Sequence, residues 1–96
     1  MNTQKYLIIV GNNVKQLRQR RGLSQEGLAE KASVSRSTIQ AVEKGKNIEL
    51  EHILNIAVAL NINPANLFLT EEERHEVTYQ AKLFWDEINA LRKITK

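Results

Sequence analysis

A short segment of the chain, residues 35–46, carries side chains of the types that recognise nucleic acids. Arg36 and Gln40 are four residues apart, so on a helix they would lie on the same face. A guanidinium group can pair with O6 and N7 of guanine, a carboxamide can pair with N6 and N7 of adenine, and an alanine methyl group can contact thymine. We expect a base-reading set made of Arg36, Ser37, Gln40 and Ala41.

The same segment contains hydroxyl and ammonium groups beside the base-reading set. Such groups bind phosphate oxygens, and phosphate contacts position a protein on DNA without reading its sequence. The residues expected to make these contacts are Ser35, Thr38, Lys44 and Lys46. Arg36 could itself bind a phosphate in place of guanine, and the sequence leaves both contacts open.

These side chains must be positioned by residues 24–45, whose pattern predicts two short helices that cross at a tight turn. The apolar residues lie three or four apart within each helix, and one lies at the turn. They are Leu28, Ala32, Val34, Ile39 and Val42. Ala29 is small enough to let the helices approach closely, and Ser24 and Ser35 are the predicted N-caps. The segment therefore predicts a helix-turn-helix, a motif that places the start of its second helix in the major groove of DNA.

The residues before the motif predict a first helix from about residue 12 to 21, with Val14 and Leu17 facing inward and Gly22 at its C-terminal end. An apolar run, residues 6–10, precedes this helix. The glycine and the two asparagines that follow the run are poor helix-interior residues. We expect the run to form a helical or extended arm packed on the core.

Two more helices are predicted after the motif, one over about residues 49–60 and a short one that begins at Asn63-Pro64. The inward face of the longer helix is expected to consist of Leu50, Ile53, Leu54, Ala57 and Leu60. The short helix carries Leu67 and Phe68. The first 69 residues therefore predict an all-α, compact five-helix domain.

Residues 70–96 predict one long amphipathic helix with two apolar stripes. The first stripe consists of Val77, Ala81, Phe84, Ile88 and Leu91, bordered by Trp85. The second stripe, on roughly the opposite face, consists of Tyr79, Leu83, Ala90 and Ile94. A core this small can cover only one stripe, so we expect the other to bind a second copy of the chain. The first stripe with Trp85 is our candidate dimer contact, although spacing alone does not decide which stripe faces the core.

Charge is divided unevenly between the two halves of the 96-residue chain. Residues 1–48 hold nine Lys/Arg against three acidic residues, a net charge of +6, whereas residues 49–96 hold five against eight, a net charge of −3. Because the positive half contains the motif, we expect affinity for phosphates that falls as salt rises. Cysteine is absent, which suits a reducing cytoplasm, and the longest apolar run is too short for a membrane helix of about 20 residues.

No arrangement of catalytic or metal-ligating residues stands out. His52 and His75 are isolated, without a cysteine partner, an HExxH spacing or a Ser-His-Asp context. The segment GKN at 45–47 lacks the upstream glycines of a phosphate-binding loop. We therefore expect no enzyme activity, no metal and no cofactor.

Residues 10–69 resemble the lambda-repressor and Cro-like (XRE-type) helix-turn-helix family. The likeness rests on the segments VGNNVKQLRQRRGLSQEGLAEKASVSRSTIQAVEKGK and ILNIAVALNINPANLF. It implies a five-helix DNA-binding domain, usually dimeric, that regulates transcription. The chain departs from the family at Gly27, where an acidic residue is common. It departs again at Ser33, where the family most often has a glycine; the serine must then adopt a positive φ.

The resemblance also implies roles for three polar residues. Gln25 matches the family's glutamine at the start of the second helix and is implied to contact phosphate and to support the recognition helix. Arg18 and Glu43 match positions that form a salt bridge between the first helix and the end of the recognition helix. The implied whole is a homodimeric regulator, in the first instance a repressor, on a pseudo-palindromic operator in double-stranded DNA.

Three alternatives stay open at this stage. Activation is compatible with the same residues, and so is the role of a restriction-modification controller, because such controllers are similarly small. An antitoxin-type or other interaction protein would instead use the C-terminal helix to bind a different protein, since fold does not fix function.

Overall fold

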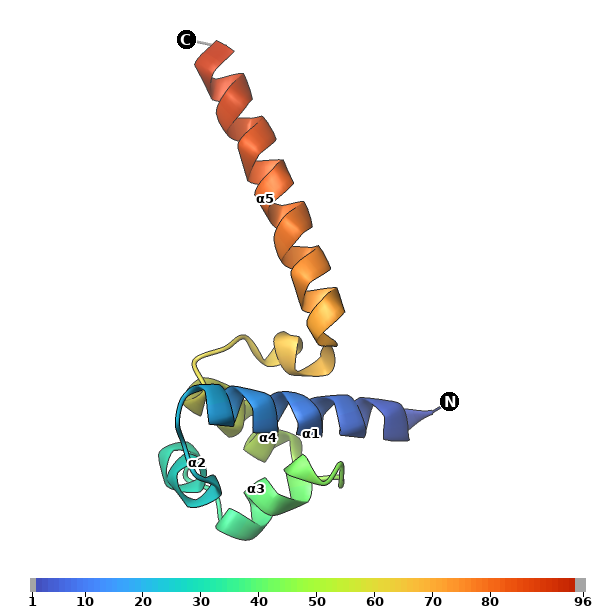
Figure 1. Ribbon diagram of the computed structural model, residues 1–96, viewed down its shortest axis with the longest axis vertical. Coiled ribbons are helices and arrows are strands. Elements are labelled where there is room, and N and C mark those ends of the chain that lie inside the picture. The colour runs from blue at the N-terminus through green and yellow to red at the C-terminus, as the bar shows by residue number, and fades with distance from the viewer. Residues whose placement is uncertain (1, 95–96) are drawn as a thin grey trace.

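The structure, a computed structural model, describes residues 2–94 except for the side chains of Val77 and Ile94. These residues form helices and no strands, as the sequence predicts. The elements are α1 (Thr3–Arg20), α2 (Gln25–Ala32), α3 (Arg36–Glu43), α4 (Leu50–Ala59), the 3₁₀ helix η1 (Pro64–Phe68) and α5 (Glu71–Ile94) (Figure 1). The elements from α1 to η1 form a compact body, and α5 projects from it.

The two motif helices start at the predicted caps. Ser24 Oγ accepts a hydrogen bond from Gly27 N at 2.9 Å, and Ser35 Oγ accepts one from Thr38 N at 3.1 Å. Ser33, between the helices, has a φ of 56°. The predicted positive φ is therefore confirmed, and a residue with a Cβ is strained there by about 1 kcal/mol.

Helix α1 begins at Thr3 rather than near residue 12, because the apolar run continues the helix. Only glycine fits at position 11 of this helix, because a Cβ there would collide with the carbonyl oxygen of Val42 and lie 3.2 Å from that of Glu43. The backbone of α1 thus rests directly on the last turn of α3. The helical form of the arm is the one adopted, and the predicted start of the first helix was wrong.

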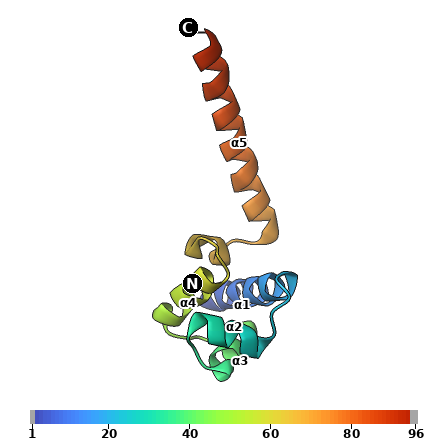
Figure 2. The same ribbon diagram turned by 90° about the vertical axis from the view of Figure 1, so that its left-hand side faces the viewer.

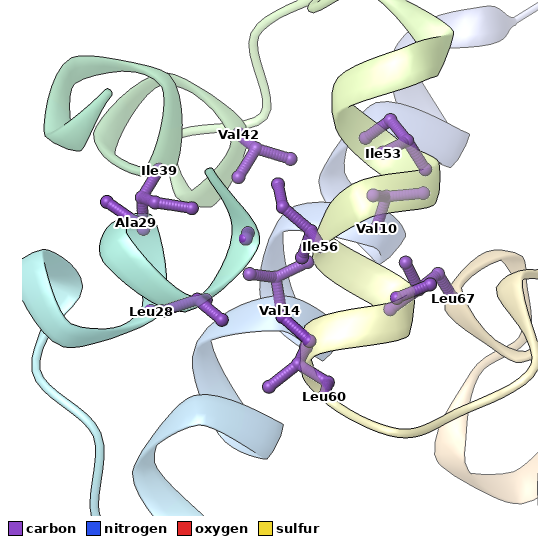
Figure 3. Close-up of a cluster of buried hydrophobic side chains, with 13 residues drawn as sticks. Val10, Val14, Leu28, Ala29, Ile39, Val42, Ile53, Ile56, Leu60 and Leu67 are labelled. Carbon is purple, nitrogen blue, oxygen red and sulfur yellow. The ribbon is translucent and has the colours of Figure 1, made fainter. Parts of the chain in front are cut away.

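The core lies where α1, α2, α3 and α4 meet, and η1 closes one side (Figure 3). Its largest fully buried side chains are Leu28, Ile39, Ile56, Leu60, Leu67, Val14 and Val42. Of the predicted motif residues only Val34, at the turn, is half-buried instead of buried. Ala29 is buried where α2 meets α3, as its small size predicts.

Three of the five residues predicted for the inward face of α4, Ile53, Ala57 and Leu60, are buried, but the other two are not. The buried residues of this helix are Ile53, Ile56, Ala57 and Ala59, with Leu60 just after it. Leu50 and Leu54, both expected inside, are 65% and 42% exposed. The helix is apolar on nearly all sides, so periodicity could not choose the inward face. The predicted short helix does begin at Pro64, but it is a 3₁₀ helix, and Phe68 is 41% exposed.

Asn13, whose role the sequence did not suggest, is the buried polar residue of the body. Its amide nitrogen donates hydrogen bonds to the carbonyl oxygens of Leu67 at 2.8 Å and Leu69 at 2.7 Å. Its carbonyl oxygen accepts a 2.7 Å bond from Arg74, which also donates to the Leu69 carbonyl. One side chain of α1 therefore holds both η1 and the first turns of α5.

Beyond its first turns α5 extends away from the body, as two views at right angles show (Figures 1 and 2). Phe84 is 59%, Trp85 56% and Leu91 60% exposed on the first stripe and its border, and Tyr79 of the second stripe is 58% exposed. The expectation that the core covers one stripe was wrong, since α5 meets the body only at its base. Val77 and Ile94 belong to the predicted stripes, but their side chains lie outside the described residues.

Replacing Gly11 with alanine should lower the free energy of unfolding by about 2 kcal/mol, because the added methyl group forces α1 away from α3. Urea denaturation followed by circular dichroism at a fixed protein concentration measures this change. Gly27→Ala is the matched control. Both atoms near its added Cβ belong to side chains, Ser24 Oγ at 3.2 Å and Leu23 Cδ2 at 3.7 Å, so this variant should change stability by less than about 1 kcal/mol. Equal effects of the two substitutions would contradict the close approach at Gly11.

Replacing Ser33 with glycine should raise the free energy of unfolding by about 0.5 kcal/mol. Glycine adopts a positive φ without strain, and its greater freedom in the unfolded chain offsets part of that gain. The same denaturation experiment measures it. Ser37→Gly, inside α3, should instead lower stability by about 0.5 kcal/mol, and a loss at both positions would contradict the assigned strain.

Candidate nucleic-acid interface

Helix α3 lies at the end of the molecule opposite the C-terminal end of α5 (Figures 1 and 2). Ile39 and Val42 turn one side of α3 into the core. Since residues of an α-helix are about 100° apart, Ser37, Gln40, Ala41 and Lys44 lie on the opposite side, and Arg36 lies at its edge. The predicted base-reading set therefore occupies one outward face.

The base-reading set is open to a ligand. Arg36 and Ser37 are exposed, and Gln40 and Ala41 are half-buried along the helix. Within residues 2–94, the side chains of Arg36 and Gln40 make no hydrogen bond or ion pair. Their donors and acceptors are thus available, whereas Ser37 Oγ lies 3.4 Å from Ser35 Oγ.

The predicted phosphate-binding residues gather at the two ends of α3. Ser35 Oγ and Thr38 Oγ1 are 2.8 Å apart in the N-terminal cap, so these hydroxyl groups already stabilise the helix start. Lys44 and Lys46 are exposed on either side of Gly45, whose φ of 76° ends the helix. The structure brings all four beside the base-reading set, and their contact with phosphate stays a prediction.

Arg18 and Glu43 form an ion pair that braces α3 from behind. Arg18 Nε donates to Glu43 Oε2 at 2.8 Å and Nη2 donates to Oε1 at 3.1 Å, with the two side chains 11% and 5% exposed. The third guanidinium nitrogen donates to the carbonyl oxygen of Leu23 at 2.8 Å. The hydrogen bond that Arg18 donates to Glu43 raises the pKa of Arg18, so this guanidinium stays charged. The pair fixes α1, the loop before α2 and the end of α3 together.

Gln25 joins this network instead of pointing only to solvent. Its amide nitrogen donates to Glu43 Oε1 at 3.3 Å, which links the start of α2 to α3. The resemblance implied that Gln25 contacts phosphate and supports the recognition helix; the bond to Glu43 gives it the second of these roles, although the partner residue was not predicted. A possible signal was its position, since it follows the N-cap of the helix that packs on α3.

The comparisons with known proteins cover the same part of the chain. A family model described as helix-turn-helix (HTH_3) matches residues 14–67. The chain belongs to this helix-turn-helix family. The matched residues include the whole of α2, α3 and α4, and with them every member of the base-reading set.

Three relatives illustrate the likeness. An uncharacterised HTH-type transcriptional regulator, YgzD of Bacillus subtilis, is 43% identical over 63 residues, which is 65% of this chain and 96% of the relative. The restriction-modification controller protein C.AhdI from Aeromonas hydrophila is 43% identical, with a TM-score of 0.61 over 65% of this chain and 96% of its own. SinR of Bacillus subtilis, solved in complex with DNA, is 28% identical, with a TM-score of 0.57 over 60% of this chain and 95% of that structure.

SinR has also been solved in a second complex, with the SinI protein. That structure is 27% identical to this chain, with a TM-score of 0.58 over 84% of this chain and 80% of its own. The family and its relatives make this chain a DNA-binding regulator of transcription. Among the described residues no helix is both long and apolar enough to span a membrane, and no group of three or more potential ligands could hold a metal.

Replacing Glu43 with glutamine should lower the free energy of unfolding by about 2 kcal/mol, because Arg18 is left largely buried without its counter-charge. Denaturation at fixed protein concentration measures the loss. The control is Glu71→Gln, which removes the partner of Arg20 at 3.3 Å in a pair that is more than half exposed on both sides. This control should change stability by less than about 0.5 kcal/mol, and similar losses in both variants would show that Glu43 does not brace α3.

Proposed function

We propose that this protein represses transcription by binding a pseudo-palindromic operator as a homodimer, with one α3 in each half-site. The observation that carries the proposal is the outward face of α3, where the unpaired side chains of Arg36 and Gln40 project from a helix braced by Arg18 and Glu43. A braced helix holds its side chains in one orientation before DNA arrives, which favours specific recognition. Such a regulator would act in the cytoplasm, where the DNA is, and would have no catalytic role.

Each side chain then has a defined task. Arg36 pairs with guanine, Gln40 pairs with adenine, and Ser37 and Ala41 contact neighbouring base edges in the major groove. The phosphate contacts come from Ser35, Thr38, Lys44, Lys46 and Gln25. Gln25 can keep its bond to Glu43 while its second amide hydrogen reaches a phosphate.

Dimer formation falls to α5, which makes residues 70–96 an element separate in role from the DNA-binding domain of residues 1–69. Support comes from the exposed first stripe, of which Phe84 and Leu91 are about 60% exposed in the single chain. A helix that keeps apolar residues in water needs a partner. The six residues proposed for the contact are Val77, Ala81, Phe84, Trp85, Ile88 and Leu91.

A second candidate function is favoured by the second stripe, which a two-helix contact would leave exposed. Tyr79 is 58% and Leu83 41% exposed there. SinR has been solved with the SinI protein, and an antitoxin-type or other partner protein could bind this chain through α5 in a comparable way. The two candidates differ in a measurable respect, because only the first requires self-association.

The test is selection of randomised duplex DNA with the purified protein at a fixed, near-physiological salt concentration. The wild-type protein should enrich an inverted repeat. Arg36→Ala should lose the preference at one base position per half-site, a discrimination of about 1 to 3 kcal/mol at that base, because the bidentate pair with guanine is gone. Binding of the selected duplex and of its single-base variants measures the difference.

Two control variants distinguish recognition of the bases from electrostatic attraction to the phosphates. Lys44→Ala should weaken binding to all duplexes alike and reduce the dependence of affinity on salt, whereas Lys82→Ala, on the exposed side of α5, should change neither. If the wild-type protein enriches no sequence and binds DNA only weakly and in a salt-sensitive way, the operator model is wrong.

A further inference from the structure

We propose that α5 pairs with α5 of a second copy in the parallel direction, with Ala81, Phe84, Ile88 and Leu91 forming the seam between them. The inference rests on the homodimer of the proposed function and adds the direction of pairing. The seam residues follow one another at intervals of three, four and three, the repeat of a two-stranded coiled coil. None of the four is buried in the single chain.

The position of α3 favours the parallel direction. Helix α5 is about 36 Å long at 1.5 Å per residue, within a molecule whose longest extent is 57 Å. Its C-terminal end and α3 lie at opposite ends of that axis (Figures 1 and 2). A parallel pair keeps both α3 helices at one end, where they can face one duplex, whereas an antiparallel pair sends them to opposite ends.

Charges beside the seam favour the same direction. In a parallel coiled coil, a residue on one edge of the seam faces the residue five positions later on the other edge of the second helix. Glu87 then faces Arg92 of the second copy, and symmetry repeats this pair. Opposite charges at these edges stabilise the pairing and select its direction.

Antiparallel arrangements place less compatible groups together. If Ala81 meets Leu91 and Phe84 meets Ile88, the two Glu87 side chains come side by side and repel each other. If one antiparallel helix is shifted by one seven-residue repeat, so that Leu91 moves toward the base of the other α5, Leu91 faces Arg74 instead. The Arg74 guanidinium is already held by Asn13 at 2.7 Å, at the base of α5, so it offers no apolar surface to Leu91.

Cross-linking through a single introduced cysteine tests the direction, because the natural chain contains none. In a parallel pair the two residues at position 91 are adjacent, so Leu91→Cys should form a disulfide-linked dimer under mild oxidation. In either antiparallel arrangement the two cysteines would lie about 15 Å or more apart along the axis, too far for a disulfide. Lys93→Cys, exposed on the side of α5 away from the seam, is the matched control and should not cross-link.

Charge exchange provides a second test that does not remove an apolar side chain. Glu87→Arg should raise the dimer dissociation constant about fivefold, measured by analytical ultracentrifugation without DNA, because two attractive pairs become repulsive. Adding Arg92→Glu to the same chain should restore the wild-type value. The antiparallel arrangements predict no such restoration, because residues 87 and 92 do not meet in them.

Disulfide formation at position 91 but not 93, together with restoration by the double exchange, supports the parallel pair. A monomeric wild-type protein, a dimer that does not cross-link at 91, or failure of the double exchange to restore the dissociation constant overturns it. These results are independent of the DNA selection. If the protein enriches a half-site but fails the cross-linking or charge-exchange test, the proposed base contacts stand and the parallel pairing is wrong. If it forms a parallel dimer but enriches no sequence, only the operator model is wrong.

Discussion

The close crossing of α1 over the last turn of α3 is the constraint on which the rest of the molecule depends. Gly11 lets the two backbones touch, and Arg18, two helical turns further along α1, grips Glu43 through two hydrogen bonds. An isolated helix of eight residues would not be stable in water. Contacts with α1 and the core therefore set the orientation of α3. The outward face of α3 is rigid because its inward face is held by these contacts.

The parts of the fold that the sequence predicted are those set by local chemistry. The serine caps and the apolar spacing of Leu28, Ile39 and Val42 follow from the residues themselves, and the structure confirms them. The positive φ at Ser33, which the structure also confirms, was implied by the family resemblance. The inward face of α4 and the start of α1 depended on tertiary contacts. Leu54 is as apolar as Ile56, so only the position of the neighbouring helices decides which of them is buried.

The candidate site divides in the same way. Periodicity along α3 was sufficient to place Arg36 and Gln40 outward, because Ile39 and Val42 define the inward side. The network around Glu43 was visible only in part, since the bond from Gln25 joins residues 18 positions apart in the chain. Asn13 was missed because an asparagine in a helix gives no local sign that three carbonyl and guanidinium partners more than fifty residues away will surround it.

The residues that hold α3 in place differ from those proposed to contact the bases, and this difference has an evolutionary consequence. Arg36, Ser37 and Gln40 contribute little to the core. If they read bases as proposed, mutations at these positions can change which operator is bound without unfolding the domain. Glu43 and Gly11 have no such freedom, because each change there disturbs the helix that carries the readers. Under the proposed function, descendants of this chain can acquire new regulatory targets through a few tolerated substitutions on one face of α3, while the scaffold behind it stays the same.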